Sequence, residues 1–108
     1  MDRNQILPPS IGTTLKLLIT ADLGDNIHLE DVDFTCVFFR VGLRNGQTIE
    51  KQEMIRMDKD EYIAVVDTKI IGTGEYYMKL SVRIPDNDVE GSLRDEVVVV
   101  PTNIRVTN

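Results

Sequence analysis

Residues 76–84 have the sequence YYMKLSVRI, in which apolar and polar side chains alternate from Met78 to Ile84. Strict alternation of this kind predicts a half-buried β-strand, because neighbouring side chains of a strand point to opposite faces. The residues that follow, 85–88, are Pro-Asp-Asn-Asp and have the composition of a turn. The stretch therefore predicts an amphipathic strand that ends near Pro85.

Further strand-like segments lie on both sides of this stretch, at residues 15–21, 32–38, 62–66 and 96–100. The last of these is expected to be broken at Pro101, which interrupts regular strand pairing, and residues 104–106 could extend it after that break. No segment has a convincing helical period, although residues 67–74 have room for one helical turn. Six to seven strands joined by tight turns predict an all-β fold, namely an antiparallel β-sandwich of about seven strands.

The length and charge of the chain limit its class. It has 108 residues, which is one domain in length, and 42% of them are hydrophobic. No apolar run approaches the roughly 20 residues of a membrane helix, and no signal peptide is visible at the N-terminus. Eighteen acidic and 12 basic residues give a net charge of −6. We expect neither a nucleic-acid nor a membrane partner, because both would repel an acidic protein.

The residue inventory points away from catalysis. The chain has one histidine, His28, and one cysteine, Cys36, so it lacks the residues of a Cys/His zinc cluster. The glycine-rich segment 72–74 lacks the lysine of a phosphate-binding loop. Cys36 alternates with Phe34 and Phe38, which predicts a buried structural thiol rather than a nucleophile. We expect a protein that is not an enzyme and uses no cofactor.

Residues 1–12 are expected to form an extended N-terminal arm, and residues 13–108 the sandwich domain. The two prolines at positions 8 and 9 favour an extended backbone and prevent regular strand pairing. Ile6, Leu7 and Ile11 provide apolar anchors. Two placements of the arm are open: it is a first edge strand on its own sandwich, or it docks on a neighbouring subunit.

Asn45-Gly46 is the strongest hairpin signal in the chain, because a type I′ turn needs positive φ at both central residues. A two-residue loop here would pair Cys36 with Ile55 and Phe34 with Met57, and would bury all four side chains. A second, unusually apolar face would then carry Val37, Phe39, Val41 and Met54. This face is covered either by the same chain, for example by the arm, or by another subunit.

The segment Gly74-Glu75-Tyr76 resembles the corner before the penultimate strand of immunoglobulin-like domains. In those domains the tyrosine hydroxyl bonds to the backbone upstream. The resemblance implies that Gly74 and Tyr76 form a structural corner and that Met78 occupies the place of the second cysteine. With a single cysteine no disulfide is possible, and Phe34 or Phe38 must stand where the core tryptophan usually lies.

The wider layout is similar to small immunoglobulin-like domains of phage and prophage tail or baseplate proteins. The resemblance covers about residues 13–100 and is carried by the segments 15–19, 29–34 and 74–80. It implies a structural subunit of a tail or baseplate, made in a bacterial cytoplasm and carried in a virion or tail particle.

Such a subunit would bind other protein chains, as a homo-oligomer or within a larger assembly. We expect contacts through the second apolar face and the edge strand near 97–100, because unburied apolar area and free strand edges favour association. The arm would contribute Ile6, Leu7, Pro8 and Pro9.

The alternative is a ligand-binding β-sandwich module of a bacterial surface protein, specific for calcium or a glycan. Asp86, Asp88 and Glu90 alternate in one loop and could supply oxygen ligands to calcium. They do not match EF-hand spacing, and turns are rich in aspartate for reasons of local geometry. Tyr62 and Tyr77 are the aromatic residues that could stack on a sugar.

Overall fold

The fold was analysed on a computed structural model, which describes residues 8–24, 26–42 and 46–108. Ile6, Leu7 and Asn45 therefore lie outside the described residues. The strands are β1 (Thr14–Thr20), β2 (Asp33–Arg40), β3 (Gln47–Glu50), β4 (Ile55–Asp58), β5 (Glu61–Asp67), β6 (Gly74–Pro85) and β7 (Leu93–Val106). The helical turns are η1 (Leu29–Asp31), η2 (Lys51–Glu53) and α1 (Thr68–Ile71). In this part of the chain, no helix has the length and apolarity to span a membrane.

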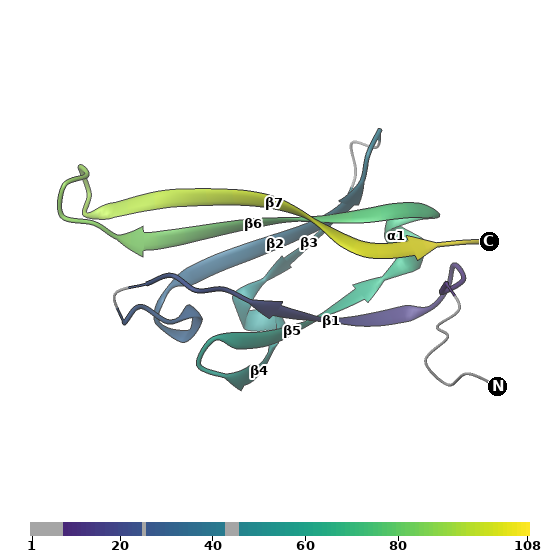
Figure 1. Ribbon diagram of the computed structural model, residues 1–108, viewed down its shortest axis with the longest axis horizontal. Helices are drawn as coiled ribbons and strands as arrows, with labels where there is room; N and C mark the ends of the chain where they lie inside the picture. The colour runs from purple at the N-terminus through teal and green to yellow at the C-terminus, as the bar shows by residue number, and fades with distance from the viewer. Residues whose placement is uncertain (1–7, 25, 43–45) are drawn as a thin grey trace.

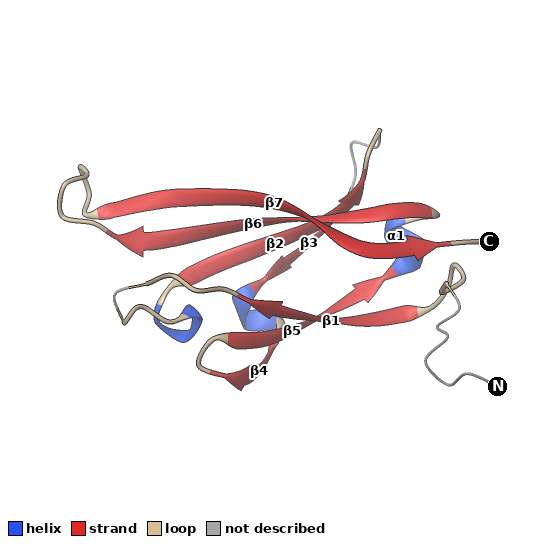
Figure 2. Cartoon of the chain, in the orientation of Figure 1, coloured by secondary structure: helices blue, strands red, loops and turns tan. Residues whose placement is uncertain are grey.

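The strands form two antiparallel sheets that face each other (Figures 1 and 2). One sheet has the order β1-β5-β4, and the other has the order β3-β2-β6-β7. The prediction of an all-β sandwich is confirmed. The β6–β7 hairpin reaches beyond the neighbouring strands at the end that carries the loop 86–92 (Figure 1).

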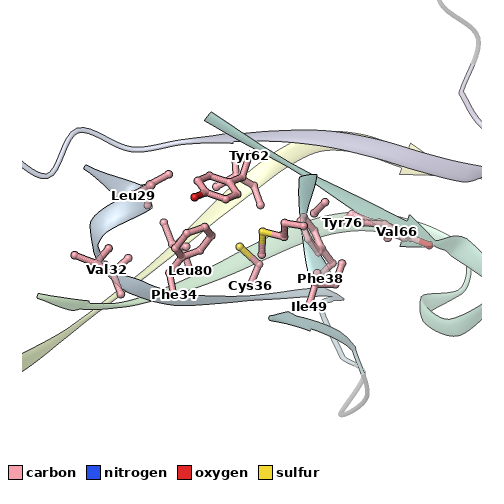
Figure 3. Packing of buried hydrophobic residues seen from close by; sticks show 14 of the residues in the cluster. Leu29, Val32, Phe34, Cys36, Phe38, Ile49, Tyr62, Val66, Tyr76 and Leu80 are labelled. Atoms are coloured by element: carbon pink, nitrogen blue, oxygen red, sulfur yellow. The ribbon is translucent and has the colours of Figure 1, made fainter. Parts of the chain in front are cut away.

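The core lies between the two sheets (Figure 3). Phe34, Cys36 and Phe38 of β2 are buried on the inward face, as their alternation predicts. The Phe34 ring meets the Tyr62 ring of the opposite sheet edge to face, with centroids 5.1 Å apart. Burial raises the pKa of the Cys36 thiol to about 12. Cys36 is therefore a structural residue.

The predicted two-residue hairpin at Asn45-Gly46 is wrong. Cys36 pairs with Ile49, and Phe38 pairs with Gln47, so a longer connection separates β2 from β3. The strand β3 ends after four residues, where η2 begins with a reciprocal capping box between Glu50 and Glu53. The chain then crosses to the other sheet.

This crossing explains the misplaced residues. Ile55 and Met57 belong to β4, which pairs with β5 in the three-stranded sheet, and both are exposed rather than buried. Met54 is buried in the core and does not share a face with Val37. The error came from a local turn preference that the crossing overrides.

The last strand does not end at Pro101, and the open alternative that residues 104–106 extend it is the correct one. β7 continues to Val106, and Pro101 lies opposite Tyr77 within the ladder. Proline is tolerated here because β7 is the edge strand of its sheet. The register shifts beyond Pro101, where Asn103 adopts a left-handed conformation with φ of 63°.

The corner between β5 and β6 is held by hydrogen bonds from side chains to the backbone. The Tyr76 hydroxyl donates to the carbonyl of Gly72 at 2.6 Å. The Thr68 hydroxyl donates to the carbonyl of Thr13 at 2.7 Å and accepts the N–H of Gly12 at 2.8 Å. The corner thus fixes the start of β1 as well as the start of β6.

Replacing Tyr76 with phenylalanine keeps the buried ring but removes the donor to Gly72. We expect Tyr76→Phe to lower the free energy of unfolding by about 1–2 kcal/mol, because the partly buried Gly72 carbonyl loses its partner. Urea denaturation followed by circular dichroism measures this difference. A value indistinguishable from wild type would show that the bond does not stabilise the corner.

The Cys36 thiol is expected to be inert in the folded protein. The thiolate is the reactive form, and burial disfavours it. Ellman's reagent at mildly alkaline pH should give no reaction with the native protein and should titrate the one cysteine after denaturation in guanidinium. Reaction of the native protein at the rate of a free thiol would contradict the buried placement.

Candidate protein-interaction surface

The candidate surface lies on the outer face of the four-stranded sheet, the face that points away from the core. The registers of β2, β6 and β7 align its side chains in rows across the strands. Phe39, Tyr77 and Pro101 form one row, and the next row contains Val37, Lys79 and Val99. Val97 lies opposite Ser81 in the third row.

Five of these residues form what we call the apolar patch: Val37, Phe39, Tyr77, Val97 and Val99. The rings of Phe39 and Tyr77 stack across adjacent strands, with centroids 5.9 Å apart. Val97 and Val99 are 57% and 55% exposed, and the other three side chains are half-buried. Among the described residues, no element packs over this face as a further layer.

The other half of the outer face is polar. The Thr35 hydroxyl donates to the Glu50 carboxylate at 2.8 Å. Arg83 forms an exposed ion pair with Asp95 at 3.2 Å. Together with Ser81 these residues line a shallow polar hollow beside the apolar patch. The face therefore has an apolar contact area with a polar border, which is the usual anatomy of a protein interface.

The structure brings together only part of the predicted contact set. Val37 and Phe39 lie on the outer face, two residues apart on β2. Val41 lies just past the end of β2 and is 74% exposed. Met54 is in the core, as described above.

The described part of the arm lies beside the end of β7. Ser10 forms a parallel bridge with Thr107, whose N–H donates to the carbonyl of Pro9 at 2.9 Å. Pro8 is exposed and Pro9 is half-buried. Residues 8–12 thus contact their own sandwich, while Ile6 and Leu7 lie outside the described residues.

The three calcium candidates lie in the loop between β6 and β7. The Asp86 carboxylate accepts the backbone N–H of Asp88 and is paired with Arg94 at 2.7 Å. These two interactions lower the pKa of Asp86. Asp88 and Glu90 are exposed, and within the described residues no group of three acidic, histidine or cysteine side chains could hold a metal ion. The Asp86 carboxylate acts as a turn-stabilising group.

The two glycan candidates have different environments. Tyr62 is buried and packs on Phe34, so its ring offers no face to a ligand. Tyr77 is on the outer face, but one side of its ring is stacked on Phe39. Tyr77 therefore contributes to the apolar patch.

The sequence predicted an edge strand near residues 97–100 but did not join Val97 and Val99 to the face of Val37 and Phe39. The signal was present in the alternation of β6, because Lys79 and Ser81 define its outer side. The missing information was the pairing of β6 with β7, which places Val99 opposite Lys79.

No protein-family model, curated protein or solved structure matches the chain.

Replacing Asp86 with asparagine tests its role in the turn. Because the folded protein lowers the pKa of Asp86, the ionised carboxylate stabilises the fold above about pH 4, and this contribution disappears as the pH falls through the lowered pKa. We expect Asp86→Asn to melt below wild type at pH 7 and the difference between the two melting temperatures to shrink as the pH falls below about 4. Asp88→Asn is the control, because it keeps the backbone N–H that Asp86 accepts. A difference that does not depend on pH would contradict this role.

Proposed function

We propose that this protein is a non-enzymatic, immunoglobulin-like β-sandwich that serves as a structural or protein-interaction subunit. It associates with other protein chains, in the first instance with copies of itself, through the apolar patch. The observation that carries the proposal is the gathering of Val37, Phe39, Tyr77, Val97 and Val99 on one sheet face that no other element of the described residues covers. Apolar side chains grouped on a sheet face among polar ones, here with Lys79 between Val37 and Val99, favour protein contacts.

The strand order supports the immunoglobulin-like type. Such domains place strands B, E and D in one sheet and strands C, F and G in the other, with C′ beside C in some of them. The orders β1-β5-β4 and β3-β2-β6-β7 agree with this arrangement. The hydrogen bond from Tyr76 to the backbone upstream agrees with the tyrosine corner of these domains.

The setting we propose is a phage-like tail or baseplate assembly. Its support is the resemblance of residues 13–100 to domains of those assemblies. The core also agrees with it, because Cys36 is a buried free thiol and the core contains no disulfide. Subunits of such particles are held together by surface contacts, which is the role that the apolar patch would play.

The test is the solution mass, measured by light scattering behind a sizing column over a wide concentration range. We expect the wild-type mass to rise above that of one chain and Val99→Lys to remain a monomer, because a charge in the patch would have to be desolvated. Val65→Lys is the matched control, since Val65 is 38% exposed on the three-stranded sheet.

Two outcomes contradict the proposal. Wild-type protein that stays monomeric at every concentration would show that the patch does not mediate self-association. If Val99→Lys and Val65→Lys lowered the solution mass of the assembly equally, association would not depend on this face. Circular dichroism of each variant establishes that the fold is retained.

A further inference from the structure

The inner side of β7 is separate from the apolar patch. Leu80 of β6 is 7% exposed, but Val98, directly opposite it on β7, is 51% exposed. The reason is that the facing sheet ends at β1, so nothing in the described chain covers the inner side of β7 at this point. Val98 and Val100 border an open depression instead.

This depression is one of two adjoining hollows that share Met78 and Val100, and we call them together the β1–β7 groove. One hollow is bordered by Leu17 and Leu18 of β1 and by Ile104. The other is bordered by Leu23, Leu80 and Val98. The groove follows β7 from Glu96 to Ile104, and its lining is mostly apolar.

Both walls of the groove are sheet edges. β1 and β7 each stand at the end of their sheet and have one hydrogen-bonded neighbour, so alternate backbone N–H and C=O groups face the open side. At Thr107 this edge already holds an extended segment: the Thr107 N–H donates to Pro9, and its carbonyl accepts the N–H of Ile11 at 2.7 Å. Among the described residues, this bridge is the one strand contact of β7 outside its ladder with β6.

The edge of β7 is protected at its two ends but not in its middle. Charged residues at 94–96 hinder the addition of another strand at one end, and Pro101 with the bulge at Asn103 hinders it at the other. Between them lie four valines, 97–100, with no charge, proline or bulge. Natural proteins usually block such a stretch, and an unblocked edge is suited to accept another strand.

Acidic residues at one end of the groove indicate which kind of side chain a bound segment would place there. Asp22 and Glu96 lie at the same end of the groove and are both exposed. Asp22 accepts the N–H of Gly24, and Glu96 is paired with Arg94 at 3.2 Å, so both carboxylates are held at this rim. In a chain of net charge −6, this end attracts a basic side chain.

We propose that the β1–β7 groove binds an extended segment of a partner protein by strand addition to β7. Apolar side chains at alternate positions of that segment enter the groove, and a lysine or arginine lies beside Asp22 and Glu96. A segment of about eight residues spans the groove at about 3.3 Å per residue. This proposal uses the inner face of β7 and is independent of self-association through the apolar patch.

The probe is a fluorescent synthetic peptide with valine at alternate positions, threonine between them and one terminal lysine. Its matched control carries N-methyl groups on alternate residues, which remove the donors that strand addition needs and keep the side chains. We expect the parent peptide to raise the fluorescence anisotropy on titration with the protein. The N-methylated peptide should bind at least tenfold more weakly.

Two lysine variants test the placement in the groove. Val98→Lys places a charge in the groove and should weaken peptide binding at least tenfold, whereas Val65→Lys lies on β5 outside the groove lining and should leave it unchanged. Asp22→Asn with Glu96→Gln should weaken binding and reduce its salt dependence. Hydrogen exchange should slow at residues 97–100 when the parent peptide is bound.

Several results would overturn the proposal: no binding of the parent peptide, equal binding of the N-methylated peptide, or equal loss in Val98→Lys and Val65→Lys. Binding that requires deletion of residues 1–7 would show that the chain's own arm occupies the groove. Loss of self-association in Val98→Lys but not in Val99→Lys would assign the groove to a second copy. None of the peptide titrations depends on the light-scattering result, so the two proposals fail separately.

Discussion

The hydroxyl of Thr68 is the constraint on which the arrangement of the two sheets depends. It is fully buried in α1, donates to Thr13 and accepts from Gly12, and so ties the beginning of β1 to the end of β5. Four residues after Thr68, the carbonyl of Gly72 receives the Tyr76 hydroxyl, which fixes where β6 starts. Since β7 pairs with β6, this corner also fixes where the β6–β7 part of the apolar patch and of the groove begins.

Local patterns in the sequence were sufficient to predict the strands and which of their side chains face the core. The alternation around Phe34, Cys36 and Phe38 and that from Met78 to Ile84 correctly separated inward from outward faces, because a strand has a strict period of two. Such a period says nothing about which strands are neighbours. The Asn45-Gly46 signal failed for this reason: a longer connection joins β2 to β3, and after η2 the chain lies in the other sheet, where Ile55 pairs with Ile63 rather than with Cys36.

In the candidate surface too, residue spacing predicts which side chains share a face of one strand, but not which strands are neighbours. Val37 and Phe39 could be assigned to one face from their spacing, but their union with Val97 and Val99 follows from the order β2-β6-β7. The four valines at 97–100 were predicted to form an edge strand, and the order of the four-stranded sheet places β7 at its edge. Pro101 agrees with this position, since a central strand does not accommodate proline.

The pairing of β1 with β5 has a kinetic consequence. Thr14 lies opposite Asp67, so the chain must close a loop that contains all of β2, β3 and β4 before this ladder can form. The β6–β7 hairpin, in contrast, closes through the short connection from Asp86 to Ser92. Loop-closure entropy therefore favours early formation of the hairpin and late docking of β1. Until β1 docks, the inner surface of β6 and β7 is open to solvent. The folding chain therefore passes through a stage in which the apolar edge of β7 is exposed and the β1–β7 groove lacks the wall formed by β1.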